Sequence, residues 1–187
     1  MDESGRWAEH EVFDVLADLE AQAETVHHWA RLAEVDDRSR AEYHEVTLDA
    51  RLMASTGLPV VLAVRGAGHV RGRLVGVGEG WCRLEDDRRA WVVRTPAVTT
   101  AQGLSSRAVP RVAWSRLDAV GLRAPLRRLA DAAARCDLVL ADGSAVAGRV
   151  ARVGADFVEV EQSSSPGAET RHVLVALDAL AVVRHEL

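Results

Sequence analysis

The chain has 187 residues, of which 48% are hydrophobic and 27% are charged, and its formal net charge is −5. This composition excludes a disordered chain, and the lack of any apolar run of about 18–20 residues excludes a membrane-spanning helix. The first residues, MDESGRWAEHE, are acidic, whereas a signal peptide begins with basic and then apolar residues, so we expect a cytoplasmic protein. The length allows one ordinary domain or two small ones.

Charge is distributed unevenly along the chain, and every basic residue is an arginine. Residues 1–57 hold 14 acidic residues and 5 arginines, residues 58–136 hold 6 and 14, and residues 137–187 hold 8 and 4. The net charges of these segments are therefore −9, +8 and −4. The basic middle segment predicts either phosphate binding or neutralisation by the acidic N-terminal segment, within one subunit or between two.

The N-terminal segment has apolar residues at helical spacing. They step alternately by four and three residues, at Val12, Leu16, Leu19, Ala23, Val26, Ala30 and Ala33. This pattern predicts an amphipathic helix, which either packs on its own protein or pairs between subunits as a short coiled coil. The pattern resumes out of phase after EVDDRS at 34–39, so the region is one long helix or a helical hairpin, and Gly57 and Pro59 end it.

From residue 60 the apolar period changes to two, which predicts short antiparallel strands separated by glycine turns. The pattern occurs twice: GRLVGVGEGWCRL at 72–84 is echoed by GRVARVGADFVEV at 148–160, 76 positions later. A helix is expected before each set of strands, at LDARLMAST and at APLRRLADAAARC. Gly72 and Gly148 fall within strands, where we expect sharp bends that leave no room for a Cβ atom.

The spacing of glycines and apolar residues resembles the first motif of Sm-like, or SH3-like, small barrels. The motif is matched by V-x-L-x-V-x-G ending at Gly66 with Val70, Gly72 and Leu74, and again by Leu138, Leu140, Asp142 and Gly143 with Val146, Gly148 and Val150. Barrels of the PRC type share much of this pattern. Sm proteins carry aspartate and asparagine six and ten residues after the bending glycine, where this chain has Gly78 and Cys82, or Gly154 and Val158. The resemblance therefore does not extend to RNA-base recognition.

The resemblance implies an α+β fold, in which an N-terminal amphipathic helix or helical hairpin precedes two small five-stranded barrels, each with its own leading helix. The expected regions are an acidic helical region at 1–57, a first barrel at 58–104, a linker with an Arg-rich helix at 105–136, and a second barrel at 137–187. The resemblance also raises the family's rings of six or seven subunits, but it does not fix such a ring for this chain, because here two barrels share one chain.

No arrangement of residues in the sequence predicts catalysis or metal binding. Cys82 and Cys136 lack CxxC or Cys/His spacing and are expected to be core residues. The adjacent His27 and His28 would point about 100° apart on a helix. The glycine-rich RGAGHVRG at 65–72 lacks the lysine and Ser/Thr of a phosphate-binding loop. We expect a protein that is not an enzyme and uses no cofactor or metal.

The sequence favours an assembly or adaptor protein, in which the helical region mediates self-association or docking with a protein partner. The alternative is RNA or DNA binding through the first barrel and the Arg-rich helix, with Trp81 or Trp91 as a stacking face. The candidate residues for nucleic-acid or partner binding are Arg65, Arg71, Arg73, Arg88, Arg89, Arg123, Arg127 and Arg128. Neither a membrane nor a small-molecule substrate is indicated.

Overall fold

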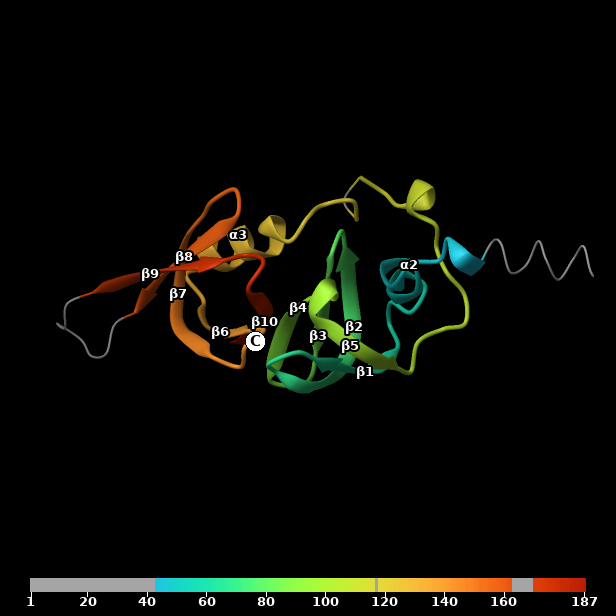
Figure 1. Ribbon diagram of the computed structural model, residues 1–187, viewed down its shortest axis with the longest axis horizontal. Coiled ribbons are helices and arrows are strands. Elements are labelled where there is room, and N and C mark those ends of the chain that lie inside the picture. The colour runs from blue at the N-terminus through green and yellow to red at the C-terminus, as the bar shows by residue number, and fades with distance from the viewer. Residues whose placement is uncertain (1–42, 117, 163–169) are drawn as a thin grey trace, which may run out of the picture. The chain divides into compact units, whose positions relative to one another are not determined.

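The computed structural model describes residues 43–116, 118–162 and 170–187 (Figure 1). The chain divides into two units, Met1–Glu45 and Val46–Leu187. The predicted helix over 12–33 lies outside the described residues. Those that are described form a β-rich unit with two short α-helices, Leu48–Met53 (α2) and Arg123–Asp131 (α3), and contain no coiled coil. The expectation of a coiled-coil protein is therefore wrong for this part of the chain.

The unit Val46–Leu187 is built on one antiparallel sheet. Its strands are β1 (Pro59–Val64), β2 (Gly68–Gly78), β3 (Trp81–Glu85), β4 (Arg89–Arg94), β5 (Val98–Gln102), β6 (Arg135–Leu140), β7 (Ala145–Val153), β8 (Phe157–Gln162), β9 (Arg171–Ala176) and β10 (Leu180–Glu186). Two 3₁₀ turns, Thr95–Ala97 (η1) and Arg111–Ala113 (η2), complete the elements. The strand order is β5-β1-β2-β3-β4-β10-β6-β7-β8-β9, so β5 and β9 are the open edges.

The prediction of two five-stranded barrels is wrong, because the ten strands form a single sheet that does not close. The joining element is β10, which pairs with β6 on one side and with β4 on the other (Figure 1). Val183 of β10 accordingly lies opposite Leu138 in one pairing and opposite Val92 in the other. The bridging strand carries a continuous apolar run, LAVV at 180–183, but such a run indicates only that both faces of the strand are buried and does not identify β4 as its second partner.

Two parts of the sheet nevertheless repeat the same pairing scheme. We call α2 with β1–β5 the first half and α3 with β6–β10 the second half. Leu62 is opposite Val70 in the first half, and Leu138 is opposite Val146 in the second, with an offset of 76 residues at both positions. Irregular positions in β2 and β7 also coincide after this offset. Each strand from β1 to β5 thus has a counterpart from β6 to β10.

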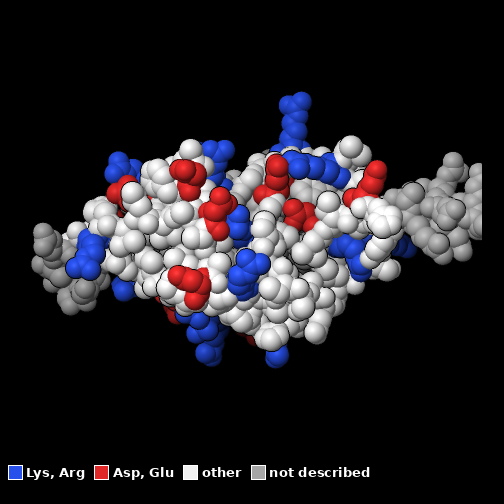
Figure 2. All heavy atoms as spheres, in the orientation of Figure 1, with Lys and Arg blue, Asp and Glu red and all other residues white. Residues whose placement is uncertain are grey.

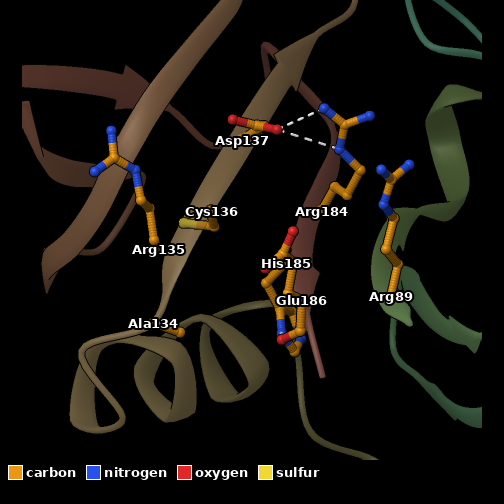
Figure 3. Close-up of a pocket in the computed structure, with 8 residues that line it drawn as sticks. All are labelled: Arg89, Ala134, Arg135, Cys136, Asp137, Arg184, His185 and Glu186. Carbon is orange, nitrogen blue, oxygen red and sulfur yellow. Dashed lines mark hydrogen bonds and ion pairs between the residues drawn. The ribbon is translucent and has the colours of Figure 1, made fainter. Parts of the chain in front are cut away.

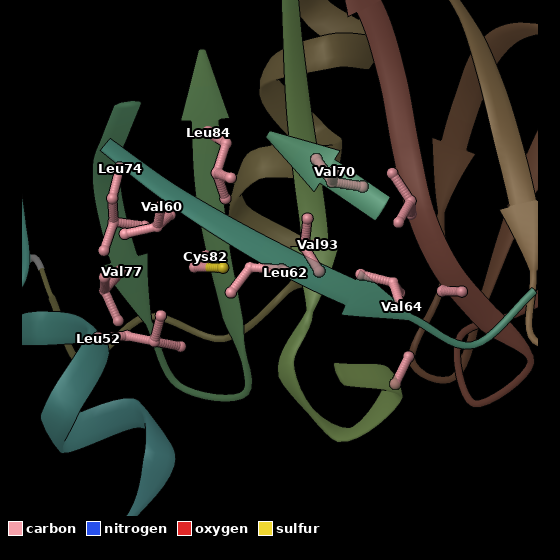
Figure 4. Packing of buried hydrophobic residues seen from close by; sticks show 13 residues of the cluster. Leu52, Val60, Leu62, Val64, Val70, Leu74, Val77, Cys82, Leu84 and Val93 are labelled. Carbon is pink, nitrogen blue, oxygen red and sulfur yellow. The ribbon is translucent and has the colours of Figure 1, made fainter. Parts of the chain in front are cut away.

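Two hydrophobic cores stabilise the sheet, and β10 belongs to both. The first core contains Leu52, Val60, Leu62, Val64, Val70, Leu74, Val77, Cys82, Leu84, Val93, Ala97, Ala181 and Val182 (Figure 4). The second contains Trp81, Val92, Leu126, Leu129, Cys136, Leu138, Val150, Val158, Val160, Val175, Leu180 and Val183. A strand buried on both faces needs a continuous apolar run rather than alternation, which explains LAVV at 180–183.

Both bending glycines lie where neighbouring backbone comes very close. A Cβ atom on Gly72 would lie 2.6 Å from the carbonyl oxygen of Glu85, and one on Gly148 would overlap the carbonyl oxygen of Glu161. Each contact is with the next strand of the sheet. The prediction that these two positions leave no room for a side chain is confirmed.

Candidate interaction surfaces

The eight predicted arginines lie in three segments. Arg65, Arg71 and Arg73 belong to the β1–β2 hairpin, Arg88 and Arg89 to the β3–β4 hairpin, and Arg123, Arg127 and Arg128 to α3. All eight residues are exposed. None of them forms an ion pair with a described acidic side chain, although Arg73 donates a hydrogen bond to the Gly57 carbonyl oxygen at 2.6 Å.

Five other arginines are paired with acidic side chains. These pairs are Arg83–Glu85, Arg94–Asp178, Arg111–Glu79, Arg152–Glu159 and Arg184–Asp137. Figure 2 shows acidic and basic side chains interspersed over one face of the molecule. On this face the charges do not gather into a continuous basic surface of the kind that follows a nucleic-acid backbone.

A pocket of about 560 Å³ lies where β4, β10 and β6 meet (Figure 3). Its lining residues are Arg89, Ala134, Arg135, Cys136, Asp137, Arg184, His185 and Glu186. The carboxylate of Asp137 accepts hydrogen bonds from Nε and Nη2 of Arg184, at 3.2 and 2.5 Å, and Arg135 points away from this pair (Figure 3). The pocket therefore combines one ion pair, Arg184–Asp137, with Arg89 and Arg135, which form no ion pair with a described acidic side chain, and Arg135 does not converge with the other two arginines.

The structure thus places Arg89 in the lining of one pocket with Arg135 and Arg184, neither of which was among the predicted residues. Arg135 lies on β6 and Arg184 lies on β10. β10 pairs with β6 on one side and with β4, the strand of Arg89, on the other. Their proximity to Arg89 depends on this bridge between the halves. The sequence carries a weak signal for it, the continuous apolar run that precedes Arg184.

Both cysteines are buried and unpaired, as expected for core residues. Burial raises the pKa of the Cys82 thiol strongly, and it raises the pKa of Cys136 to about 11. A thiol with a raised pKa is largely protonated near neutral pH and is a poor nucleophile or metal ligand. Although Cys136 borders the pocket, it therefore adds no chemical activity to it.

An apolar face is covered in the first half and exposed in the second. We define the β8–β9 face as Phe157 and Leu174, the counterparts of Trp81 and Val92. In the first half, Trp81 and Val92 are 7% and 3% exposed, and both pack in the second core. Phe157 and Leu174, in contrast, are 37% and 65% exposed. The second half therefore presents to solvent the face that the first half uses to join it.

A charged cluster lies beside the β8–β9 face. Glu159 lies opposite Leu174 in the β8–β9 pairing. Its carboxylate accepts hydrogen bonds from Nε and Nη2 of Arg152 at 2.9 and 3.2 Å, and it lies 3.0 Å from Nδ1 of His172. The hydrogen bond from Arg152 is the main cause that holds the pKa of Glu159 below its usual range. These contacts give the exposed apolar face a polar rim.

The open edges of the sheet complete the set of candidate surfaces. An edge strand carries backbone N–H and C=O groups that no neighbouring strand satisfies, and proteins often protect such strands with proline or lysine. β9, with the sequence RHVLVA, has no proline, and its one arginine, Arg171, is its first residue. The counterpart of β9 in the first half is β4, and β10 pairs with the outer edge of β4. The counterpart of β10 in the first half is β5, which is the other open edge of the sheet. The two open edges are thus equivalent to two strands that pair in the middle of the sheet.

Two other kinds of site are absent from the described ranges. In residues 43–116, 118–162 and 170–187, no group of three or more His, Cys, Asp or Glu side chains is placed to hold a metal ion. No helix of these ranges is long and apolar enough to cross a membrane. The resemblance to Sm-like, SH3-like or PRC-type barrels rests on the sequence pattern alone, because the chain matches no protein-family model and no curated protein.

Proposed function

We propose that the protein is a non-enzymatic assembly or adaptor protein that binds another protein through the β8–β9 face. The observation that supports this proposal is the exposure of Leu174, which is 65% exposed where its counterpart Val92 is 3% exposed. Complete burial of a leucine side chain contributes about 1.5–3 kcal/mol. An apolar face that is equivalent to an internal contact, but left open, is typical of an interaction site.

The chemistry of β9 is also suited to protein binding. Its outer edge can accept a further strand through main-chain hydrogen bonds, and alternate side chains can then give specificity. Leu174 and Phe157 supply the apolar contact, while the ion pair of Glu159 with Arg152 forms a polar rim. An apolar centre with a polar rim is the usual arrangement of a protein–protein interface.

The test compares Leu174→Glu with Val112→Glu in tagged full-length chains purified from cells that express the protein naturally. Val112 is 96% exposed in η2, so both variants place a carboxylate at an exposed apolar position. We expect a stoichiometric polypeptide, either a different protein or an untagged copy, to be retained by the wild type and by Val112→Glu. Leu174→Glu should weaken its binding about tenfold or more, in line with the lost apolar burial.

Two results would contradict the proposal. One is a wild-type chain that retains no other polypeptide under these conditions. The other is a folded Leu174→Glu variant, with an unchanged circular dichroism spectrum, that retains the same polypeptides as the wild type in the same amounts.

A second candidate function is nucleic-acid binding. It is favoured by the eight exposed arginines, which have no acidic partner among the described side chains. RNA and DNA should then bind at low salt with an affinity that falls steeply as salt is added. The double variant Arg127→Glu and Arg128→Glu should weaken binding strongly. Absence of binding to either polymer at low salt would exclude this function.

A further inference from the structure

We infer that the partner of the β8–β9 face is the β5 edge of a second copy of this chain, so that the sheets of successive copies join head to tail. The inference rests on the proposed function and identifies its partner. It follows from the internal repeat, because the β4–β10 pairing inside one chain joins the counterparts of β9 and β5. Each copy of the chain therefore exposes two edge strands, β9 and β5, which are the counterparts of the two strands, β4 and β10, that already pair inside the chain.

The equivalence of positions follows from the pairings within each half. Leu174 is opposite Glu159 as Val92 is opposite Arg83, and Ala101 is opposite Leu62 as Val183 is opposite Leu138. The last strand of each half also shifts register at the equivalent place. In β5 the shift falls between Thr100, opposite Ala63, and Val98, opposite Val64; in β10 it falls between Val182, opposite Val139, and Leu180, opposite Leu140. The counterpart strands thus agree in register as well as in order.

This equivalence predicts the register of the contact between copies. Val183 of β10 lies opposite Val92 of β4, so Ala101 of one copy should lie opposite Leu174 of the next. The observed pair combines two valines, whereas the predicted pair combines the larger leucine with the smaller alanine. Facing a large residue with a small one keeps the filled volume similar, as well-packed cores do.

The β5 edge can accept this contact. It has no charged residue over Val98–Gln102, and Thr99 and Thr100 are exposed there. Threonine is a β-branched residue that favours extended strands, and its hydroxyl tolerates solvent when the edge is free. A contact between unlike edges produces either an open chain of copies, which leaves one β5 and one β9 free at its ends, or a closed ring, in which every β5 is paired with a β9.

Disulfide trapping tests the inference in the full-length protein. Residues directly opposite on antiparallel strands have Cβ atoms about 4.5–5.5 Å apart, close enough for disulfide formation after small shifts. Ala101→Cys and Leu174→Cys chains are mixed under mild oxidation, and Val112→Cys mixed with Leu174→Cys serves as the collision control. The native thiols are buried, so they do not compete for cross-linking.

We expect the mixture of Ala101→Cys and Leu174→Cys to form a cross-linked heterodimer at least about tenfold faster than the control mixture, because pairing raises the effective concentration of the two thiols. A chain with both substitutions should form a ladder of dimers, trimers and larger species, or a ring. Thr100→Lys, which charges an exposed position of β5, should suppress this cross-linking without changing the circular dichroism spectrum.

Several results would overturn the inference. Dominant Leu174→Cys homodimers would indicate β9–β9 pairing, and cross-linking no faster than in the control would leave Leu174 to another occupant, such as residues 1–42 of the same chain or a different protein. The purification experiment separates this failure from that of the proposed function. If Leu174→Glu releases a different protein and no copy-to-copy cross-link forms, the adaptor function stands and self-pairing falls. If the wild type binds no polypeptide and no cross-link forms, both fall.

Discussion

Val183→Ala should destabilise both halves of the sheet together. The Val183 side chain is fully buried in the second core, while its strand also pairs with β4 of the first half. The substitution removes two carbon atoms at about 0.8 kcal/mol each and leaves a small cavity, so the free energy of unfolding should fall by about 2 kcal/mol. For a unit of this size the midpoint of thermal unfolding should fall by about 4–8 °C.

The assay combines urea unfolding, followed by far-UV circular dichroism, with hydrogen exchange of peptides from β2–β3 and β7–β8. We expect one transition, with both sets of peptides losing protection at the same lowered urea concentration, because β10 holds the two halves in one sheet. Val112→Ala, at a 96% exposed position, is the control and should leave the midpoint unchanged. Loss of protection in β7–β8 while β2–β3 keeps its original midpoint would refute the reasoning, since the halves would then unfold independently.

Three further predictions concern individual sites. Gly72→Ala should lower the free energy of unfolding by about 1–3 kcal/mol. Gly76→Ala is the control: its Cβ would meet nothing closer than 3.9 Å, so the free energy of unfolding should change by less than about 1 kcal/mol. Equal losses of unfolding free energy for the two variants in denaturant titrations would contradict this prediction. The ion pair of Glu159 and Arg152 should stabilise the fold above the ordinary carboxyl pKa of 4.5 and lose its effect as pH falls through the lower folded pKa. Arg152→Gln should therefore lower stability at pH 7 but not in strong acid, and a pH-independent loss would argue against the pair. The two buried thiols should react with a thiol reagent at pH 8 only after unfolding, and rapid reaction of the folded protein would show that they are accessible.

The sequence predicts the local structure of the sheet better than its global connection. Alternating apolar residues identified the strands near Leu62 and Leu138, and the repeated phrase identified Gly72 and Gly148 as positions without space for a side chain. Both are local properties, because they depend on neighbours along the strand or in the adjacent hairpin. The pairing of β10 with β4 joins segments about 90 residues apart, and no local pattern specifies such a contact.

The candidate interaction surfaces were also predicted only where they depend on local sequence. The exposed arginines were predicted from charge alone, since a surface charge needs no partner to be identified. The β8–β9 face was missed because the sequence shows Trp81 and Phe157 as equivalent aromatic residues, and it gives no sign that one is covered and the other exposed. That difference arises from the second half packing against the first, with nothing in the described chain packing equivalently against the second.

The double role of β10 also affects how the protein folds during synthesis. β10 is the last of the described strands to leave the ribosome, yet it supplies Ala181 and Val182 to the first core and covers the edge of β4. Until then, the nascent first half carries an incomplete core and an unsatisfied strand edge, which are the features that promote aggregation of folding intermediates. The first half can therefore reach its final stability only after β10, at Leu180–Glu186, has been translated.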